Sequence, residues 1–257
     1  MQNLKDKIVF ITGASSGIGE ACAEAFAKEG ANLTLCARRI DRLKENSLRL
    51  IENYGIKVHF FELDVRDQRM VDFQISSLPD DWKNIDVLVN NAGLSRGLNK
   101  LYEGKIVDWE EMIDTNVKGL LYVSRAVIPG MVERKLGDII NIGSIAGHEV
   151  YAKGNVYCAT KFAVDALTKG LRLDLLGTPL RVCTIDPGLV ETEFSEVRFR
   201  GDKERAKTIY QGCQPLTPVD IADCVVYAAS RPAHVQIAEI IVLATAQRAA
   251  TTIWREK

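Results

Sequence analysis

The chain has 257 residues, of which 33 are Lys or Arg and 34 are Asp or Glu, so its formal net charge is −1. This balance provides no electrostatic footprint for nucleic acid or an anionic membrane, and the length suits one large α/β domain covering residues 1–257. No apolar run approaches the ~18 residues of a membrane span, and the first residues lack the apolar core of a signal peptide.

The six cysteines are scattered through apolar segments without C-x-x-C spacing. They are typical of reduced core residues, which favours a cytoplasmic protein. Cys158 adjoins a tyrosine, but no partner signature supports a nucleophile there. The sequence shows no Cys/His/acid cluster that indicates a metal site, so no metal is expected.

Short apolar strands alternate with helical stretches from one end of the chain to the other. The predicted strands are residues 8–11, 32–37, 58–63, 87–90, 138–142, 181–185 and 240–243. A helix after the first strand is expected to end at Gly30, and a second clear helix is expected from Tyr157 to Gly177. Continuous apolar strands separated by helices are typical of a parallel sheet covered on both faces. The pattern predicts a doubly wound α/β fold.

The turn after the first strand is rich in glycine and opens a helix. Its residues follow G-x-x-x-G-x-G spacing, not the usual G-x-G-x-x-G, and are Gly13, Ser15, Ser16, Gly17, Ile18 and Gly19. Backbone N–H groups at such a turn can approach a pyrophosphate at the helix N-terminus. A glycine-rich turn alone is often only a tight connection, but its place after the first buried strand favours a nucleotide site.

The end of the second predicted strand indicates which dinucleotide is bound. A fold that prefers NAD carries an acidic residue about 20 residues beyond the glycine turn, whereas this chain has Arg38 and Arg39 there. An arginine suits a 2′-phosphate through charge-assisted hydrogen bonds, and a carboxylate would repel it. The alternative is a pair of solvated loop arginines, but the missing acid favours NADP.

The most informative stretch is Tyr157-x-x-x-Lys161, with Ser144 thirteen residues upstream at the end of a predicted strand. Residues four apart share one helix face, so the phenol and the ammonium project to the same side. A phenol holds its proton to a pKa of about 10, and a neighbouring cation lowers that pKa toward neutral. The Tyr–Lys spacing alone is weak, because an ordinary helix with an exposed lysine also carries it.

Together these motifs resemble those of the short-chain dehydrogenase/reductase family. The resemblance covers essentially the whole chain and also rests on Asn90-Asn91-Ala92-Gly93, Asn116 and Pro187-Gly188. The runs 141–147, 187–195 and 197–201 are most similar to the NADP-dependent 3-hydroxy acid dehydrogenases, which oxidise serine, L-allo-threonine and related acids. The resemblance implies a Rossmann fold with seven strands in the order 3-2-1-4-5-6-7, and a homotetramer.

The same resemblance implies roles for single residues. Tyr157 is the general acid/base, Ser144 positions and polarises the reacting oxygen, and Lys161 lowers the phenol pKa and holds the nicotinamide ribose. Asn116 anchors a water that links Lys161 to solvent. The remaining cofactor contacts that the resemblance implies are Asp64, Val65, Asn91, Ala92, Gly93, Pro187, Gly188, Val190 and Thr192.

The carboxylate of a 3-hydroxy acid would need a cationic or multi-donor partner near the reaction centre. Arg198 lies in a segment that, by resemblance, closes over substrate, and a planar guanidinium can hold a carboxylate bidentately. The alternative is a surface arginine, with Arg96 or backbone N–H groups binding the carboxylate. His148 either lines the pocket or is a satisfied loop histidine.

The function predicted from these residues is NADP-dependent hydride transfer at the hydroxyl carbon of a 3-hydroxy acid or 3-hydroxy amino acid. One alternative is a carbonyl or 3-oxoacyl reductase of the same family. A second alternative is a dinucleotide-binding sensor without catalysis, which would be expected to lack the tyrosine or the lysine.

Overall fold

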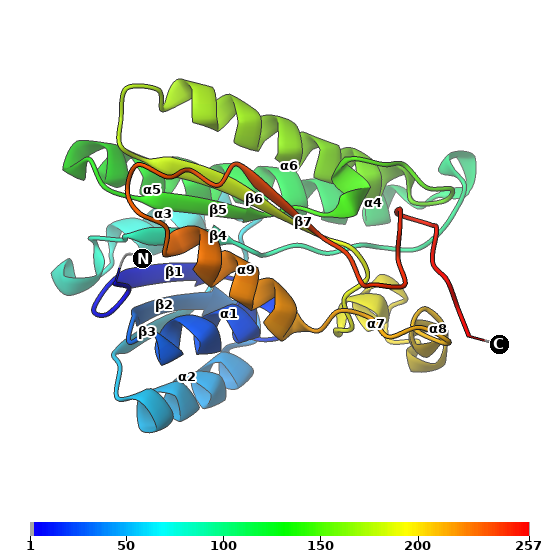
Figure 1. Ribbon diagram of the computed structural model, residues 1–257, viewed down its shortest axis with the longest axis horizontal. Coiled ribbons are helices and arrows are strands. Elements are labelled where there is room, and N and C mark those ends of the chain that lie inside the picture. The colour runs from blue at the N-terminus through cyan, green and yellow to red at the C-terminus, as the bar shows by residue number, and fades with distance from the viewer. Residues whose placement is uncertain (1–2, 257) are drawn as a thin grey trace.

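The computed structural model describes residues 3–256, which form a seven-stranded parallel sheet with helices on both faces (Figure 1). The strand order is β3-β2-β1-β4-β5-β6-β7, as predicted. The strands are β1 (Ile8–Thr12), β2 (Asn32–Ala37), β3 (Val58–Glu62), β4 (Val87–Asn90), β5 (Asp138–Ile142), β6 (Arg181–Pro187) and β7 (Glu239–Val242). The order reverses between β1 and β4, and ligands of open α/β sheets bind outside the carboxyl ends of the strands at such a point.

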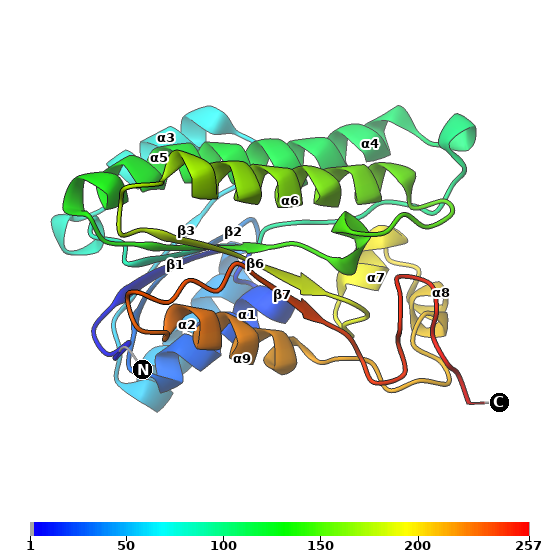
Figure 2. The same ribbon diagram turned by 45° about the horizontal axis from the view of Figure 1, so that its top comes forward.

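Two helical layers cover the sheet, and Figures 1 and 2 show them from two directions. One layer contains α1 (Gly17–Lys28), α2 (Ile40–Tyr54) and α9 (Pro218–Ala229). The other contains α3 (Gln68–Ser76), α4 (Ile106–Ile113), α5 (Leu120–Arg134) and α6 (Asn155–Asp174). The short helices α7 (Phe194–Arg198) and α8 (Lys203–Thr208) lie beyond the carboxyl ends of β6 and β7.

Four shorter turns of helix complete the described elements: η1 (Asp80–Trp82), η2 (Leu101–Glu103), η4 (Ile145–Gly147) and the π-helical η3 (Asp114–Gly119). Between residues 3 and 256, no helix combines the length and the apolar character needed to cross a bilayer.

Alternate residues of each central strand contribute to two different cores. Val9 and Ile11 of β1 pack with Phe26 of α1 on one face, whereas Phe10 packs in the opposite core with Val127 of α5. Successive side chains of a strand point to opposite faces, so two covered faces require uninterrupted apolar strands. This requirement explains why the strands are so clearly visible in the sequence.

The observed strands agree with the predicted ones to within two residues at each end. The predicted helix over residues 157–177 instead runs from Asn155 to Asp174, so its predicted end was wrong by one turn. The chain turns tightly there, since Thr178 N–H donates to Leu175 O at 3.0 Å. Gly177 follows outside the helix with φ of +87°, a left-handed conformation that glycine adopts without strain.

Candidate active site

Tyr157 and Lys161 lie one turn apart on α6 and are both buried, with 8% and 7% of their surface exposed. The Lys161 Nζ is 6.0 Å from the centre of the Tyr157 ring and donates to the carbonyl oxygen of Ile142 at 2.9 Å. The alternative of an ordinary helix with an exposed lysine was therefore wrong. Lysine is almost never fully buried in a structural core, so a buried ammonium on the same helix face as a buried phenol is typical of a reaction centre.

Burial shifts both pKa values in the direction that disfavours charge. It lowers the pKa of Lys161 to about 8. It also raises the pKa of Tyr157, Tyr151 adds to that rise, and Arg198 and Ser144 act against it. The sequence predicted that Lys161 would lower the phenol pKa, but the cation that acts in this direction is Arg198, whose Cζ lies 5.3 Å from the ring centre.

Ser144 stands between the end of β5 and the short helix η4. Its backbone N–H donates to Asp186 Oδ1 at 3.0 Å, and its hydroxyl accepts from Ala146 N–H at 3.1 Å. The preceding Gly143 has no room for a Cβ, which would collide with the Asp186 carboxylate. The Asp186 side chain thus fixes the turn that carries the Ser144 hydroxyl next to Tyr157.

Asn116 lies in the π-helical segment η3, and π-turns inside helices are frequent at functional sites. Its side chain accepts from Leu94 N–H at 2.8 Å and donates to Leu94 O at 2.8 Å and to Thr160 Oγ1 at 3.0 Å. A Cβ on Gly93 would lie 3.4 Å from Asn116 Oδ1 and 3.8 Å from Lys161 Nζ. Asn116 is therefore beside Lys161, although no spacing in the sequence relates the two.

The glycine turn joins β1 to α1 at the switch point of the sheet. Gly13 and Gly17 have φ of +67° and +57°, and a Cβ on Gly19 would collide with Asn91 Nδ2. Ser16 is the N-cap of α1 but makes no side-chain capping hydrogen bond, so its side chain leaves the first N–H groups of the helix unbonded. A free helix N-terminus of this kind is suited to bind a pyrophosphate.

Thr12 and Asn91 connect this turn to the end of β4. The Thr12 hydroxyl accepts from the N–H groups of Asn91 and Ala92, both at 3.0 Å. The Asn91 amide in turn donates to Thr12 O at 2.9 Å. The predicted contacts from Asn91 to Gly93 thus lie beside the glycine turn, which they approach from the neighbouring strand.

Arg39 spans the glycine turn, while Arg38 is exposed beside Asp64 and acts electrostatically on its carboxylate. The Arg39 guanidinium donates to Ser16 Oγ at 2.5 Å and to Ser15 Oγ at 3.4 Å. It also forms an ion pair with Glu193 at 2.7 Å. Arg39 therefore contacts the candidate cofactor site, although 43% of its side chain is exposed.

The segment after β6 crosses back toward the glycine turn. A Cβ on Gly17 would touch the Thr192 side chain at 3.4 Å, and Gly188 has no room for a Cβ next to the Gln247 amide. Val190 forms an isolated bridge with Leu216. The segment from Pro187 to Thr192 thus faces the glycine turn, where the sequence predicted cofactor contacts.

Arg198 closes the other side of the reaction centre, at the end of α7. Its guanidinium lies 5.2 Å from the ring centre of Phe194 and donates to Ser95 Oγ and to the Tyr151 hydroxyl, both at 3.0 Å. It is half-buried against Tyr157, so the alternative of an ordinary surface arginine was wrong.

Arg96 lines a cleft beside Tyr157, together with Ser95 and Met112. Its guanidinium is already engaged, because it pairs with Glu111 and donates to Val197 O. Only 14% of the Arg96 side chain is exposed. Arg96 is consequently a weaker candidate than Arg198 for binding a substrate carboxylate.

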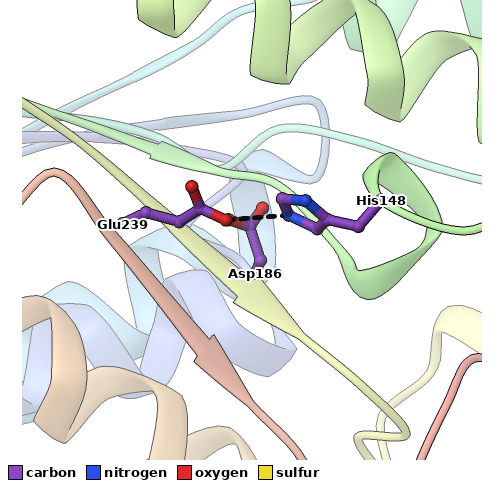
Figure 3. A group of neighbouring side chains, drawn as sticks. All are labelled: His148, Asp186 and Glu239. Carbon is purple, nitrogen blue, oxygen red and sulfur yellow. Dashed lines mark ion pairs between the residues drawn. The ribbon is translucent and has the colours of Figure 1, made fainter.

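His148 faces Asp186 and Glu239 (Figure 3). The sequence shows no cluster of this kind, whereas the fold brings these three residues together. His148 and Asp186 lie near the ends of neighbouring strands, and sequence spacing cannot reveal such a contact.

Several residues of the site were missed from the sequence. Asp186 holds the Ser144 turn, Tyr151 bonds to Arg198, and Glu193 pairs with both Arg39 and Arg42. Asp186 directly precedes the Pro187-Gly188 pair, so its position was a usable signal.

Comparison with known proteins agrees with this arrangement. The family model for short chain dehydrogenases matches residues 7–203. The NADP-dependent 3-hydroxy acid dehydrogenase YdfG of Shigella flexneri is 48% identical over 231 residues, which are 90% of this chain and 92% of that protein. The NADP-dependent 3-hydroxy acid dehydrogenase of Schizosaccharomyces pombe is 43% identical over 258 residues, covering 100% of both chains.

A solved structure of the closed form of serine dehydrogenase, complexed with NADP+, superposes with a TM-score of 0.91 at 45% identity. The match covers 97% of this chain and 100% of that one. Sheet order, the arrangement of Ser144, Tyr157 and Lys161, and these similarities lead to one assignment. The chain belongs to the short-chain dehydrogenase/reductase family.

Proposed function

We propose that this protein is an NADP-dependent oxidoreductase that acts on the hydroxyl carbon of a 3-hydroxy acid or a 3-hydroxy amino acid such as serine or L-allo-threonine. The observation that carries the proposal is the position of Arg198, a cation half-buried against Tyr157. An acid substrate needs such a partner, because a carboxylate buried beside a phenol is costly unless it is paired. The names of the relatives point to the same class of reaction.

In the proposed reaction Tyr157 exchanges the hydroxyl proton of the substrate and Ser144 donates a hydrogen bond to the reacting oxygen. NADP, when bound, supplies the hydride acceptor. Tyr157 must lose its proton before alcohol oxidation, and burial raises its pKa, so neighbouring positive charge is required to make the phenolate accessible. The Arg198 Cζ lies 5.3 Å from the ring centre and the Lys161 Nζ lies 6.0 Å from it, so both cations are close enough to supply that charge.

The same proposal assigns the cofactor to the carboxyl ends of β1, β2 and β4. The glycine turn and the N-terminus of α1 would hold the pyrophosphate, and Arg38 and Arg39 would hold the 2′-phosphate. Arg39 supports this assignment because its guanidinium already lies on Ser15 and Ser16 of the glycine turn. Asp64 and Val65 would contact the adenine.

We further propose that residues 1–257 form a single dinucleotide-binding and catalytic domain that assembles as a homotetramer in the cytoplasm. Free cysteines at all six positions support a reducing compartment. Large apolar side chains exposed on three helices support assembly: Ile106 and Val107 of α4, Leu121 and Val132 of α5, and Phe162 and Leu173 of α6.

Turnover with a panel of substrates tests the proposed reaction. NADP⁺ reduction is measured with serine, L-allo-threonine and 3-hydroxy acids, and with uncharged secondary alcohols of similar size as controls. The proposal requires a higher kcat/KM for the acids. Preferred reduction of 3-oxoacyl or uncharged carbonyl substrates would identify the alternative reductase, and NADPH binding without any turnover would identify a sensor.

A further inference from the structure

A histidine and two carboxylates meet where the start of β7 lies beside the carboxyl-end half of β6 (Figure 3). His148 directly follows η4, Asp186 is the penultimate residue of β6, and Glu239 opens β7. β7 pairs with β6 so that Glu239 lies opposite Thr184. Asp186 is two residues beyond Thr184 and therefore shares its face of the sheet.

The three side chains are spaced as ligands of one ion. His148 Nε2 lies 3.4 Å from Asp186 Oδ2 and 3.2 Å from Glu239 Oε1, and all three ligand atoms are within 4.8 Å of one another. Zinc binds nitrogen and oxygen at about 2.0–2.2 Å in a tetrahedron, whose corners are then roughly 3.3–3.6 Å apart. The two separations from His148 Nε2 are close to that spacing.

Two of the ligand atoms in this group have no hydrogen-bond partner among the described residues. His148 Nε2 and Asp186 Oδ2 are both shielded from solvent, and neither has a hydrogen-bond partner. They face each other at an ion-pair distance of 3.4 Å, but not in the geometry of a hydrogen bond. Asp186 is 1% exposed, so its unsatisfied oxygen has no access to bulk water. An unpaired carboxylate oxygen at this depth is costly, and a bound cation would remove that cost.

We propose that His148, Asp186 and Glu239 bind a divalent transition-metal ion of the zinc type. Imidazole selects for this class over Mg²⁺ and Ca²⁺, and two carboxylates balance the charge of the ion. The His148 and Glu239 side chains are 20% and 30% exposed, which leaves a path from solvent and room for water to complete the coordination.

The proposed role of the ion is structural, because the second carboxylate oxygen of Asp186 binds the Ser144 turn. Asp186 Oδ1 accepts the backbone N–H of Ser144 at 3.0 Å, while Oδ2 points to His148. A metal ion on Oδ2 links the end of β6 and the start of β7 to the turn that carries Ser144. The competing arrangement is a protonated His148 that bridges the two carboxylates without any metal.

The test uses the full-length protein without an affinity tag, dialysed against a chelator and then titrated with ZnCl₂ in a calorimeter. Co²⁺ replaces Zn²⁺ in a parallel titration, because its visible absorption reports coordination geometry. We expect one Zn²⁺ per chain, a Co²⁺ spectrum of low coordination number, and a Tm that rises with added metal. These readouts do not depend on the proposed substrate or on NADP.

Two variants remove single ligands while keeping a polar side chain, His148→Gln and Glu239→Gln. Each is expected to weaken Zn²⁺ binding by at least about tenfold, since even indirect contacts to a metal contribute that much. His234→Gln removes an exposed imidazole outside the group and is expected to bind Zn²⁺ as the parent does. Circular dichroism and Tm without metal confirm that each variant is folded.

Two results overturn the proposal. One is a parent protein that shows no Zn²⁺-dependent heat, Co²⁺ spectrum or Tm shift, which would leave the protonated His148 bridge. The other is equal Zn²⁺ affinity in the parent, His148→Gln and Glu239→Gln, which would put the ion elsewhere on the chain.

Discussion

The guanidinium of Arg198 lies against the ring of Tyr157, with its Cζ 5.3 Å from the ring centre. Two hydrogen bonds, to Ser95 and Tyr151, hold it there. The same cation therefore favours the phenolate of Tyr157 and is placed to pair with an anion bound beside it. The Arg198 side chain therefore affects proton transfer by Tyr157 and can also bind the carboxylate of the substrate.

Arg198→Met tests this double position. Loss of one charged hydrogen bond is worth about 1.5–3 kcal/mol, so kcat/KM for a hydroxy acid is expected to fall by roughly tenfold or more. An uncharged secondary alcohol of similar size is expected to lose less, since only the effect on Tyr157 remains. Steady-state kinetics with both substrates give the comparison.

Arg205→Met is the matched control for that experiment. Arg205 lies in the following helix α8, stacks on Phe199 with its Cζ 4.2 Å from the ring centre, and is exposed. Its replacement should leave both substrates nearly unchanged. An equal fall for acid and alcohol in Arg198→Met would mean that Arg198 only supports its segment and that the carboxylate is bound elsewhere.

Cofactor choice is tested by Arg38→Ala and Arg39→Ala. A charge-assisted bond to a 2′-phosphate is worth about 1.5–3 kcal/mol, so each loss should weaken NADPH binding by roughly tenfold to over a hundredfold. NADH lacks that phosphate, and its affinity is expected to stay nearly constant. Fluorescence titration with the two nucleotides measures both affinities.

Arg42→Ala distinguishes the loss of a contact with the 2′-phosphate from the loss of an ion pair with Glu193. Arg42 binds Glu193 at 2.6 Å, as Arg39 does at 2.7 Å, but it makes no described contact with the glycine turn. Its removal should change NADPH affinity least of the three. If all three variants lost affinity for NADPH and NADH alike, the arginines would not select the phosphate.

Tyr157→Phe removes the proposed proton carrier and keeps the aromatic packing. The ring meets Phe194 edge-on at 5.6 Å between centres, a contact that phenylalanine preserves. We expect kcat to fall by about 10²–10⁴-fold with little change in Tm or NADPH affinity. Tyr151→Phe removes a neighbouring hydroxyl as a control and should cost less. Turnover of Tyr157→Phe within a few-fold of the parent would falsify its role.

Lys161 should make the stability of the protein depend on pH. Burial lowers its pKa from 10.5 to about 8. At a pH where Lys161 is protonated in both the folded and the unfolded state, this shift lowers the free energy of unfolding by about 3 kcal/mol. Between pH 8 and about 10.5 the folded chain releases this proton and the unfolded chain keeps it. The free energy of unfolding should therefore rise with pH in that window relative to a variant without the amine.

Lys161→Met provides that reference. Urea unfolding of parent and variant at several pH values should show a difference that grows in favour of the parent by roughly 1–3 kcal/mol above pH 8. A difference that stays constant across the window would show that the ammonium is not held against a desolvation cost.

The strands were predictable because their physics is local, whereas their order followed from the family resemblance. A strand buried on both faces needs consecutive apolar residues. The run Val9, Phe10 and Ile11 is of this kind and is visible in the sequence. The neighbouring positions of Tyr157 and Lys161 were also predictable, since a helix fixes the direction of residues four apart. The glycine turn was visible for the same reason.

The end of α6 and the pKa of Tyr157 were not predictable in this way. The helix ends where the chain turns toward β6, and the phenol pKa depends on burial by segments from other parts of the chain. Arg198 reaches Tyr157 only because α7 folds over α6. A through-space charge of this kind leaves no spacing in the sequence.

The sequence by itself determined the sheet, the glycine turn and the Tyr157–Lys161 pair, since each is set by hydrophobic period or by backbone geometry within a few residues. Only the tertiary structure decided that Arg198 lies beside Tyr157 and that His148 meets Asp186 and Glu239. A parallel sheet brings together segments that are far apart along the chain. The chemistry at these contacts therefore depends on the folded sheet.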